Sequence, residues 1–375
     1  MESLGSLTRV KRVCFLASLL YTDRLNPDLQ SWIKQLRSGD ARALARAISA
    51  VENHAPGWSD LLKALFPYTG RARVIGLTGA PGAGKSTMVD QLAQLYRSGE
   101  DPHTSTGSGR TFSREERARN GAPYNEDGAP GDDRCTVGIL AVDPTSPYTG
   151  GAILGDRIRM QQHFSDPGIY IRSMATRGSL GGLARTTADV ATVLDASGRD
   201  VILIETVGVG QDEVDIVRLA DITVVILVPG MGDDVQTIKA GIMEIADIFV
   251  INKSDHEGAE RVEREIRALQ SLDTRHDGWT PPIVKTVASE GKGIAELAAA
   301  IAEYEAYLQK EDRALKKSVE NWQARLVEML RDAMLEKAHT QLGDGNLAQL
   351  AAEVAEHKRD PYTLVEELAA KVSRV

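Results

Sequence analysis

The sequence predicts an α/β protein built on a mostly parallel sheet, with helical extensions at both ends of the chain. Short apolar runs alternate with segments of helical periodicity, which is the order expected of strand–helix units. The runs are nearly continuous in apolar residues, as in parallel strands that helices cover on both faces. With 375 residues, 42% of them apolar, the chain is long enough for two or three domains with a sizeable core.

Apolar runs mark the expected strands of this sheet, and helical patterns lie between them. The strands are expected at residues 73–78, 137–142, 201–205, 222–228, 248–251 and 283–287. The helices are expected at residues 85–96, 182–196, 235–245 and 258–272. This alternation predicts a doubly wound α/β domain that occupies residues 71–310.

Helical patterns also precede and follow this domain. Residues 1–70 are expected to form an N-terminal helical segment, in which Asp40 is a candidate N-cap. Residues 311–375 are expected to form a C-terminal helical arm, whose last helix begins at Asp360-Pro361. The arm carries an apolar stripe of Val319, Trp322, Leu326, Met329, Leu330 and Met334. The stripe is longer than a small appendage needs, so we expect the arm to form a homodimer.

Residues 97–134 break the alternation of strands and helices. The segment is rich in Gly, Ser, Pro and charges of both signs, and its only large apolar residues are Phe112 and Tyr124. It is too polar to bury and too long for an ordinary connection. We therefore expect a disordered insertion between a helix and the next strand.

Composition excludes several classes of protein. The net charge is −9 and the isoelectric point is near 5.4, which argues against sequence-independent binding of nucleic acid. Only two cysteines occur, Cys14 and Cys135, so a disulfide scaffold is excluded and a cytoplasmic location is expected. No run of 18 apolar residues predicts a transmembrane helix, and the apolar stretch 13–21 lacks the cleavage site of a signal peptide.

A glycine-rich loop follows the first expected strand and opens the first helix of the domain. Residues 79–86 read GAPGAGKS and fit the P-loop pattern at every fixed position. Such loops turn backbone N–H groups toward phosphate oxygens, while a lysine supplies positive charge and a serine binds Mg²⁺. The expected nucleotide contacts are Gly79, Gly82, Ala83, Gly84, Lys85, Ser86 and Thr87.

A second motif predicts which base is bound. Asn252-Lys253-Ser254-Asp255 follows the strand 248–251 and matches the N-K-x-D pattern of GTP-binding proteins. A carboxylate at Asp255 can accept two hydrogen bonds from N1–H and N2–H₂ of guanine, which adenine does not offer. The stem of Lys253 can lie across the base. The sequence therefore favours GTP over ATP.

Acidic residues lie where a Mg-nucleotide enzyme needs them. Asp143 follows one expected strand, Glu205 ends another, and Asp156 lies in a Gly-Asp-Arg segment. The carboxyl ends of parallel strands face the ligand crevice, so these acids are expected to hold Mg²⁺, partly through water. The amide of Gly208 is placed to sense the γ-phosphate. Gln211 is the best local candidate for orienting the attacking water.

These motifs together resemble the MeaB/ArgK/MMAA G-proteins. The resemblance rests on GAPGAGKST and on four longer segments, at residues 141–160, 173–184, 205–216 and 229–255. The family's fold is a P-loop G-domain of the SIMIBI class, with an N-terminal helical segment and a C-terminal dimerisation arm. Its members use GTP and Mg²⁺ to gate cofactor delivery to adenosylcobalamin-dependent acyl-CoA mutases, such as methylmalonyl-CoA mutase, and to protect those enzymes.

The resemblance also implies roles for particular residues. Lys85, Ser86, Asp143, Asp156 and Glu205 match phosphate and metal positions, and Asn252 and Asp255 match base-reading positions. Residues 230–241, with Lys239, match a loop that communicates with the mutase. The chain departs from the family at the segment 97–134 and at Ala288-Ser289, where Ser-Ala is usual. A base contact from Ala288 and Ser289 is therefore expected less firmly than one from Asp255.

The expected reaction is slow hydrolysis of GTP by in-line attack of water. Lys85, Mg²⁺ bound near Glu205, and loop amides would stabilise the developing charge. Three alternatives stay open at this point: an ATP-dependent kinase of a transport protein, a GTPase that delivers metal to nickel enzymes, and a scaffold without catalysis. Metal delivery would call for clustered His or Cys, whereas the seven His are scattered.

Overall fold

The computed structural model describes residues 26–99, 134–143, 163, 165–175, 182–206, 219–230, 245–272, 278–310, 312–342 and 344–373. The chain divides into two compact units, Met1–Ala314 and Leu315–Val375. The expected insertion 97–134 and the expected helix 235–245 lie largely outside the described residues.

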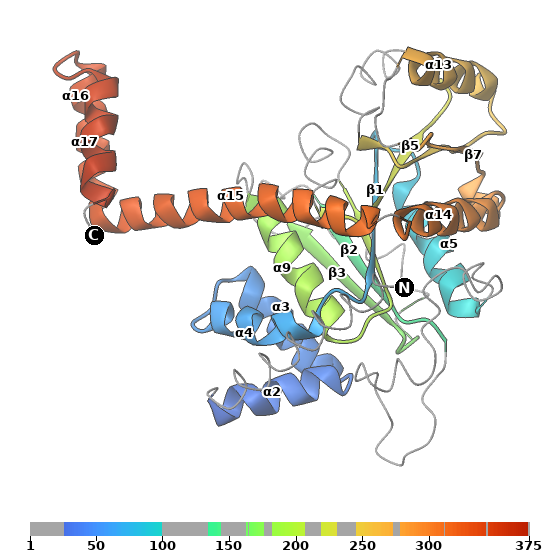
Figure 1. Ribbon diagram of the computed structural model, residues 1–375, viewed down its shortest axis with the longest axis horizontal. Helices are drawn as coiled ribbons and strands as arrows, with labels where there is room; N and C mark the ends of the chain where they lie inside the picture. Colours follow the sequence, from blue (N-terminus) through green and yellow to red (C-terminus); the bar gives the residue numbers. More distant parts are fainter. Residues whose placement is uncertain are drawn as a thin grey trace. The chain divides into compact units, whose positions relative to one another are not determined.

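A parallel sheet of seven strands forms the centre of the first unit (Figure 1). Its spatial order is β3-β2-β4-β1-β5-β6-β7, so β1 lies in the middle. The strands are β1 (Arg73–Gly79), β2 (Val137–Asp143), β3 (Ile169–Ala175), β4 (Val201–Glu205), β5 (Ile222–Leu227), β6 (Ile248–Ile251) and β7 (Ile283–Lys285). The α/β fold and the six expected strands are confirmed.

Strand β3 was not predicted. It lies at the edge of the described sheet and pairs with β2. Its sequence, IYIRSMA, mixes apolar residues with Arg172 and Ser173, so it lacks the continuous apolar run of a central strand. Arg172 forms an ion pair with Glu52 of the N-terminal helices instead of facing solvent alone.

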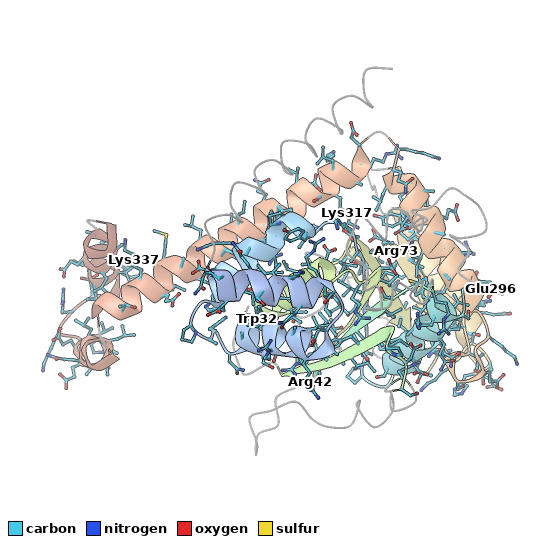
Figure 2. All side chains as sticks on the ribbon, turned by 90° about the horizontal axis from the view of Figure 1, so that it is seen from below. Trp32, Arg42, Arg73, Glu296, Lys317 and Lys337 are labelled. Carbon is cyan, nitrogen blue, oxygen red and sulfur yellow. The ribbon has the colours of Figure 1, made fainter. Side chains whose placement is uncertain are left out.

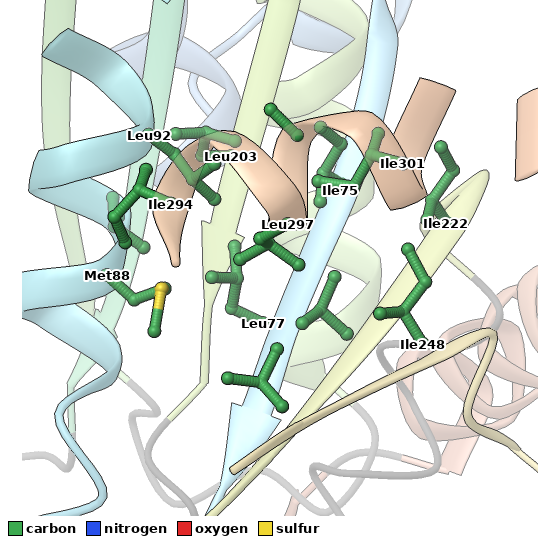
Figure 3. Close-up of a cluster of buried hydrophobic side chains, with 14 of the residues drawn as sticks. Ile75, Leu77, Met88, Leu92, Leu203, Ile222, Ile248, Ile294, Leu297 and Ile301 are labelled. Atoms are coloured by element: carbon green, nitrogen blue, oxygen red, sulfur yellow. The ribbon is translucent and has the colours of Figure 1, made fainter. Parts of the chain in front are cut away.

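One face of the sheet is covered by α5 (Lys85–Ser98) and α14 (Ile294–Leu308). Figure 3 shows the apolar side chains that meet there, among them Ile75 and Leu77 of β1, Met88 of α5 and Leu297 of α14. All four are completely buried. Helix α14 was not predicted, although its apolar residues recur at helical spacing. This core holds α5, and therefore the loop before it, against the centre of the sheet.

The opposite face is covered by α9 (Gly182–Ala196) and by α13 (Ala259–Leu272), which packs against β5 and β6. The N-terminal helices α2 (Pro27–Arg37), α3 (Ala41–Glu52) and α4 (Trp58–Leu65) pack beside α9 (Figure 1). Asp40 caps α3 by accepting hydrogen bonds from the N–H groups of Arg42 and Ala43, both at 2.8 Å, as predicted.

Aspartates stand at the amino edge of the sheet, directly before several strands. Each accepts a hydrogen bond from the backbone N–H at the start of a neighbouring strand. The pairs are Asp200 with Thr136 (2.8 Å), Asp221 with Val74 (3.0 Å) and Asp247 with Thr223 (2.8 Å). These carboxylates satisfy backbone donors that the parallel ladder leaves open at its first rung.

The second unit consists of helices. Helix α15 (Arg313–Leu342) begins at its boundary and is followed by α16 (Asp344–Ala355) and α17 (Pro361–Ser373). Lys317 and Lys337 lie on α15 in Figure 2. Asp360 caps α17 through the N–H of Thr363 at 2.8 Å, as predicted. None of the helices that the structure describes is both long and apolar enough to cross a membrane.

Large apolar side chains of α15 are exposed. They include Val319, Leu326, Leu330 and Met334, each more than half exposed. Their spacing of seven, four and four residues places them along one side of the helix. The stripe expected from the sequence therefore exists and is accessible on this helix.

Candidate nucleotide-binding site

The P-loop runs from the end of β1 to the start of α5, as the motif requires. Gly79 and Gly84 have positive φ angles of 142° and 88°. A Cβ atom at Gly79 would lie 2.1 Å from the carbonyl oxygen of Ile226, and one at Gly84 would lie 2.3 Å from Nδ2 of Asn252. Only glycine fits either position, because both the backbone conformation and the space exclude a side chain.

The Lys85 ammonium is buried inside the curve of this loop. Its Nζ donates to the carbonyl oxygens of Gly79 at 2.8 Å and Ala80 at 3.0 Å, and the residue is 6% exposed. Since α5 begins at Lys85, the side chain projects from the first turn of a helix whose partial positive charge favours anions. The loop thus concentrates positive charge where a phosphate is expected.

Glu205 and Ser86 meet at the carboxyl edge of the sheet. The Ser86 hydroxyl donates to Oε1 of Glu205 at 2.6 Å, and Glu205 is 5% exposed. Next to them, the Thr206 hydroxyl donates to Oγ1 of Thr78 at 3.0 Å, which ties the end of β4 to the end of β1. A serine hydroxyl beside a carboxylate, both oxygen donors, fits Mg²⁺, which uses one or two carboxylates and keeps several waters.

The other expected metal and switch residues are only partly described. Asp143 ends β2, two residues after Ala141, which pairs with Glu205 of β4. Its backbone therefore lies at the same edge, but its side chain is outside the described set. Asp156, Gly208, Gln211 and Lys239 also lie outside the described residues. Among the described residues, no three His, Cys, Asp or Glu side chains gather into a metal cluster.

Asn252 joins the P-loop to the loop after β7. Its Nδ2 donates to the carbonyl oxygen of Ala83 at 2.8 Å. Its Oδ1 accepts from the hydroxyl of Thr286 and from the N–H of Ala288, both at 3.1 Å. The residue is 2% exposed. Asn252 therefore fixes the relative positions of two loops that both border the expected nucleotide.

Lys253 and Asp255 lie on the outer side of the same motif. Lys253 has a positive φ of 54°, and its Nζ donates to the carbonyl oxygen of Gly82 at 3.1 Å. Its stem therefore extends over the P-loop. The Asp255 side chain is 53% exposed, with Nε2 of His256 at 3.9 Å from its Oδ2. The carboxylate that is expected to read the base is thus accessible.

The loop after β7 uses its two expected contact residues differently. Ala288 is 2% exposed and its N–H already bonds to Asn252, whereas Ser289 is exposed. In the same loop, the hydrogen bond from Lys292 to Glu290, and to a smaller extent the charge of Asp255, raise the pKa of Lys292.

Sequence reasoning missed Thr286 and Thr78. Both are 1% exposed and lie at the carboxyl ends of strands or directly beyond them. A threonine there could have been noted, because buried hydroxyls need partners. Their partners, Asn252 and Thr206, are distant in sequence and could not be identified without the fold.

A model of one protein family matches most of the chain. Its description is "Methylmalonyl Co-A mutase-associated GTPase MeaB", and it matches residues 44–101 and 132–342, which include the P-loop, Glu205 and the motif 252–255. The chain belongs to this MeaB family. Residues 102–131 are not part of the match.

Relatives and solved structures agree with this membership. A protein named as a GTPase from Pyrococcus abyssi is 43% identical over 91% of this chain and 95% of its own length. The mitochondrial methylmalonic aciduria type A homolog of Caenorhabditis elegans is 32% identical over 80% of this chain and 70% of its own. A crystal structure described as a LAO/AO transport system kinase superposes with a TM-score of 0.62 and 25% identity, covering 93% of this chain and 99% of that one. The P-loop fold and GTPase family are thereby confirmed.

Proposed function

We propose that this MeaB-family GTPase is a Mg-dependent chaperone of an adenosylcobalamin-dependent acyl-CoA mutase. It gates delivery of the cofactor and protects the mutase, of which methylmalonyl-CoA mutase is the first candidate. The observation that carries the proposal is the family match, whose description names association with methylmalonyl-CoA mutase and whose span includes both nucleotide motifs. The related protein of Caenorhabditis elegans, named for methylmalonic aciduria, supports the same assignment.

The P-loop supplies the binding of the phosphates. Backbone N–H groups of the loop and the Lys85 ammonium face the phosphates, and Lys85 moves from its carbonyl partners toward the phosphate oxygens. Ser86 and Glu205 would hold Mg²⁺, with Asp143 and Asp156 as further ligands, directly or through water. Bound Mg²⁺ supplies positive charge that offsets the charge developing on the γ-phosphate.

Guanine is selected by Asp255, whose exposed carboxylate can accept from N1–H and N2–H₂. Lys253 covers the P-loop side of the base, and the exposed residue Ser289 is a further contact from the loop after β7. The name of the related transport-system kinase structure makes an ATP-dependent kinase the second candidate. Competition between nucleotides decides between them: displacement of bound GDP by GTP but not by ATP is expected, and equal displacement would favour the kinase.

The proposed chemistry is slow without a partner. Gly208 and Gln211 are proposed to sense the γ-phosphate and to orient water, and no general base is proposed beside them. Without a well-held water, P-loop GTPases turn over slowly until a partner completes the site. The residues 230–241, with Lys239, are the proposed contact to the mutase.

The exposed stripe of α15 is the proposed homodimer surface. A row of large apolar side chains, each more than half exposed, is costly in water and is covered when two such helices meet. Sedimentation of the chain as a species of twice 40.6 kDa is expected, and Leu326→Asp with Leu330→Asp is expected to give the monomer. A wild-type monomer at micromolar concentration would contradict this surface.

The proposed location is the cytoplasm.

The mutase assignment is tested with the full chain loaded with a non-hydrolysable GTP analogue. A cobalamin enzyme, identified by mass spectrometry, is expected to co-purify with it from the source cell. The same purified mutase is expected to raise the GTPase rate at least about tenfold. The ATP analogue serves as the control. A fast basal rate that no acyl-CoA mutase changes would overturn the chaperone role, and metal delivery would then gain support if nickel altered the rate.

A further inference from the structure

We propose that Thr286 is a positioning residue for nucleotide binding, which acts by fixing the side-chain amide of Asn252. Thr286 lies directly after β7, between that strand and the loop 287–293. It is 1% exposed, so its hydroxyl faces the protein interior and not the solvent. The inference rests on nucleotide binding by the P-loop and does not depend on the mutase.

Three hydrogen bonds join Thr286 to residues 251–254, which include the start of the base-reading motif. Its N–H donates to the carbonyl oxygen of Ile251 at 2.9 Å, and its carbonyl oxygen accepts from the N–H of Ser254 at 3.0 Å. Its hydroxyl donates to Oδ1 of Asn252 at 3.1 Å. The backbone bonds would persist with any side chain, whereas the third bond requires a hydroxyl.

The hydroxyl helps to determine which way the Asn252 amide points. Thr286 and Ala288 both present donors to Oδ1, while the carbonyl of Ala83 requires a donor and receives Nδ2. A flipped amide would place its NH₂ group against the N–H of Ala288 and its oxygen against the carbonyl of Ala83, whereas the Thr286 hydroxyl can donate or accept. Ala288 and Ala83 therefore select one orientation, and the Thr286 hydroxyl stabilises it by donating to Oδ1.

This orientation leaves one donor of Asn252 available. A primary amide carries two N–H groups, and one of them binds Ala83. Within the described part of the chain the other N–H has no hydrogen-bond partner, while Oδ1 already accepts twice. A purine ring offers acceptor nitrogens to such a donor, and the held Ala83 carbonyl shapes the P-loop. Thr286 thus supports base and phosphate binding through the same amide.

The neighbouring glycine shows that the position is tightly fitted. A Cβ atom at Gly293 would lie 2.2 Å from the carbonyl oxygen of Lys285 and 3.0 Å from both Cα and Cγ2 of Thr286. Gly293 also has a positive φ of 78°. The loop therefore lies directly against the Cα atom and the methyl group of Thr286.

Threonine can be separated into its two parts by substitution. Thr286→Val keeps the methyl group and shape but loses the hydroxyl, whereas Thr286→Ser keeps the hydroxyl and loses the methyl. We expect Thr286→Val to weaken GDP binding about three- to tenfold, since one hydrogen bond is lost. Thr286→Ser is expected to bind GDP with a Kd within twofold of the wild-type value. A packing role alone would reverse this order, so the reversed result would overturn the proposal.

Comparison of GDP with IDP, which lacks the 2-amino group, separates Thr286 from Asp255. Thr286→Val is expected to weaken the binding of both nucleotides by the same factor, so that the ratio of the Kd for IDP to the Kd for GDP stays unchanged. Asp255→Asn is expected to bring this ratio close to one. The GTPase rate at saturating GTP should stay within twofold in Thr286→Val, with the loss confined to KM. Failure of the guanine assignment would appear as a wild-type ratio of one, which is a different result from failure of Thr286.

Thr223 provides the matched control. It is a completely buried threonine of β5 whose hydroxyl has no hydrogen-bond partner in the described part of the chain. Thr223→Val is expected to leave GDP affinity unchanged. Equal Kd values for Thr286→Val, Thr223→Val and wild type, measured by equilibrium titration of a fluorescent GDP, would refute the role of Thr286.

Discussion

Acidic side chains lie at both edges of the parallel sheet, but they bind different kinds of partner. At the amino edge, Asp200, Asp221 and Asp247 accept from backbone N–H groups of neighbouring strands. At the carboxyl edge, Glu205 accepts from the hydroxyl of Ser86, a side chain that is itself a candidate metal ligand. The first set satisfies backbone donors of the sheet, whereas Glu205 and Ser86 are candidate metal ligands.

The cations at the two edges differ in the same way. At the amino edge, the Arg97 guanidinium binds both oxygens of the Asp166 carboxylate, with Nε at 2.8 Å and Nη2 at 2.6 Å. At the carboxyl edge, the Lys85 ammonium donates to the carbonyl oxygens of Gly79 and Ala80. An ammonium group that binds neutral carbonyl oxygens can exchange these partners for an anionic ligand. A guanidinium group that is paired with a carboxylate is already neutralised by it. Changes at the carboxyl edge should therefore cost activity, and changes at the amino edge should cost stability.

The largest expected effect is that of Lys85→Ala. Loss of the ammonium removes charge stabilisation of the transferring phosphoryl group, so single-turnover GTP hydrolysis is expected to fall about 10²- to 10³-fold. The melting temperature should change little, because the hydrogen bonds that Lys85 donates to Gly79 and Ala80 lie within its own loop. Lys63→Ala is the control, since Lys63 is exposed on α4 and pairs with Asp60. Undiminished hydrolysis by Lys85→Ala would indicate a scaffold without catalysis.

Asp247→Ala is expected to show the opposite result. It leaves the buried N–H of Thr223 without its acceptor, which costs about 1–3 kcal/mol of unfolding free energy. Affinity for GDP is expected to stay the same, because Asp247 lies at the far edge. Asp247→Asn retains an acceptor oxygen and should lose less. Urea unfolding and nucleotide titration measure the two quantities, and a nucleotide defect without loss of stability would break the comparison.

The sequence alone was sufficient to predict those parts of the site that are contiguous motifs. The P-loop and the motif 252–255 were readable because each is a contiguous run with a required strand before it. The edge strand β3 was missed because it lacks the apolar continuity of a central strand. The partners of Thr286 were missed because the hydrogen bond to Asn252 joins residues 34 positions apart. The aspartates before β4, β5 and β6 could have been noted, since each directly precedes an apolar run.

The smallest expected effect concerns the pH dependence of the amino edge. The hydrogen bond from Arg97 holds the pKa of Asp166 below its usual 3.8. A carboxylate with a lowered pKa stabilises the fold fully above the unfolded value and loses this contribution as the pH falls through the folded value. Asp195 at the same edge behaves oppositely: burial raises its pKa, so its ionisation above pH 3.8 reduces stability.

Asp166→Asn separates the contributions of these two carboxylates to stability, because it removes the charge of Asp166 and leaves Asp195 unchanged. At pH 6 the variant is expected to be about 1–2 kcal/mol less stable than wild type, because a charge-assisted pair becomes a neutral one. As the pH falls below about 4, the difference should shrink, since wild-type Asp166 also becomes neutral. Urea unfolding of both proteins from pH 6 to pH 3 measures the difference, with GDP affinity at pH 7 as the control. A difference in unfolding free energy that stays constant across this range would mean that the Arg97–Asp166 pair does not contribute through its charge. The contrast between the paired cation Arg97 at the amino edge and the Lys85 ammonium at the carboxyl edge would then lose its physical basis.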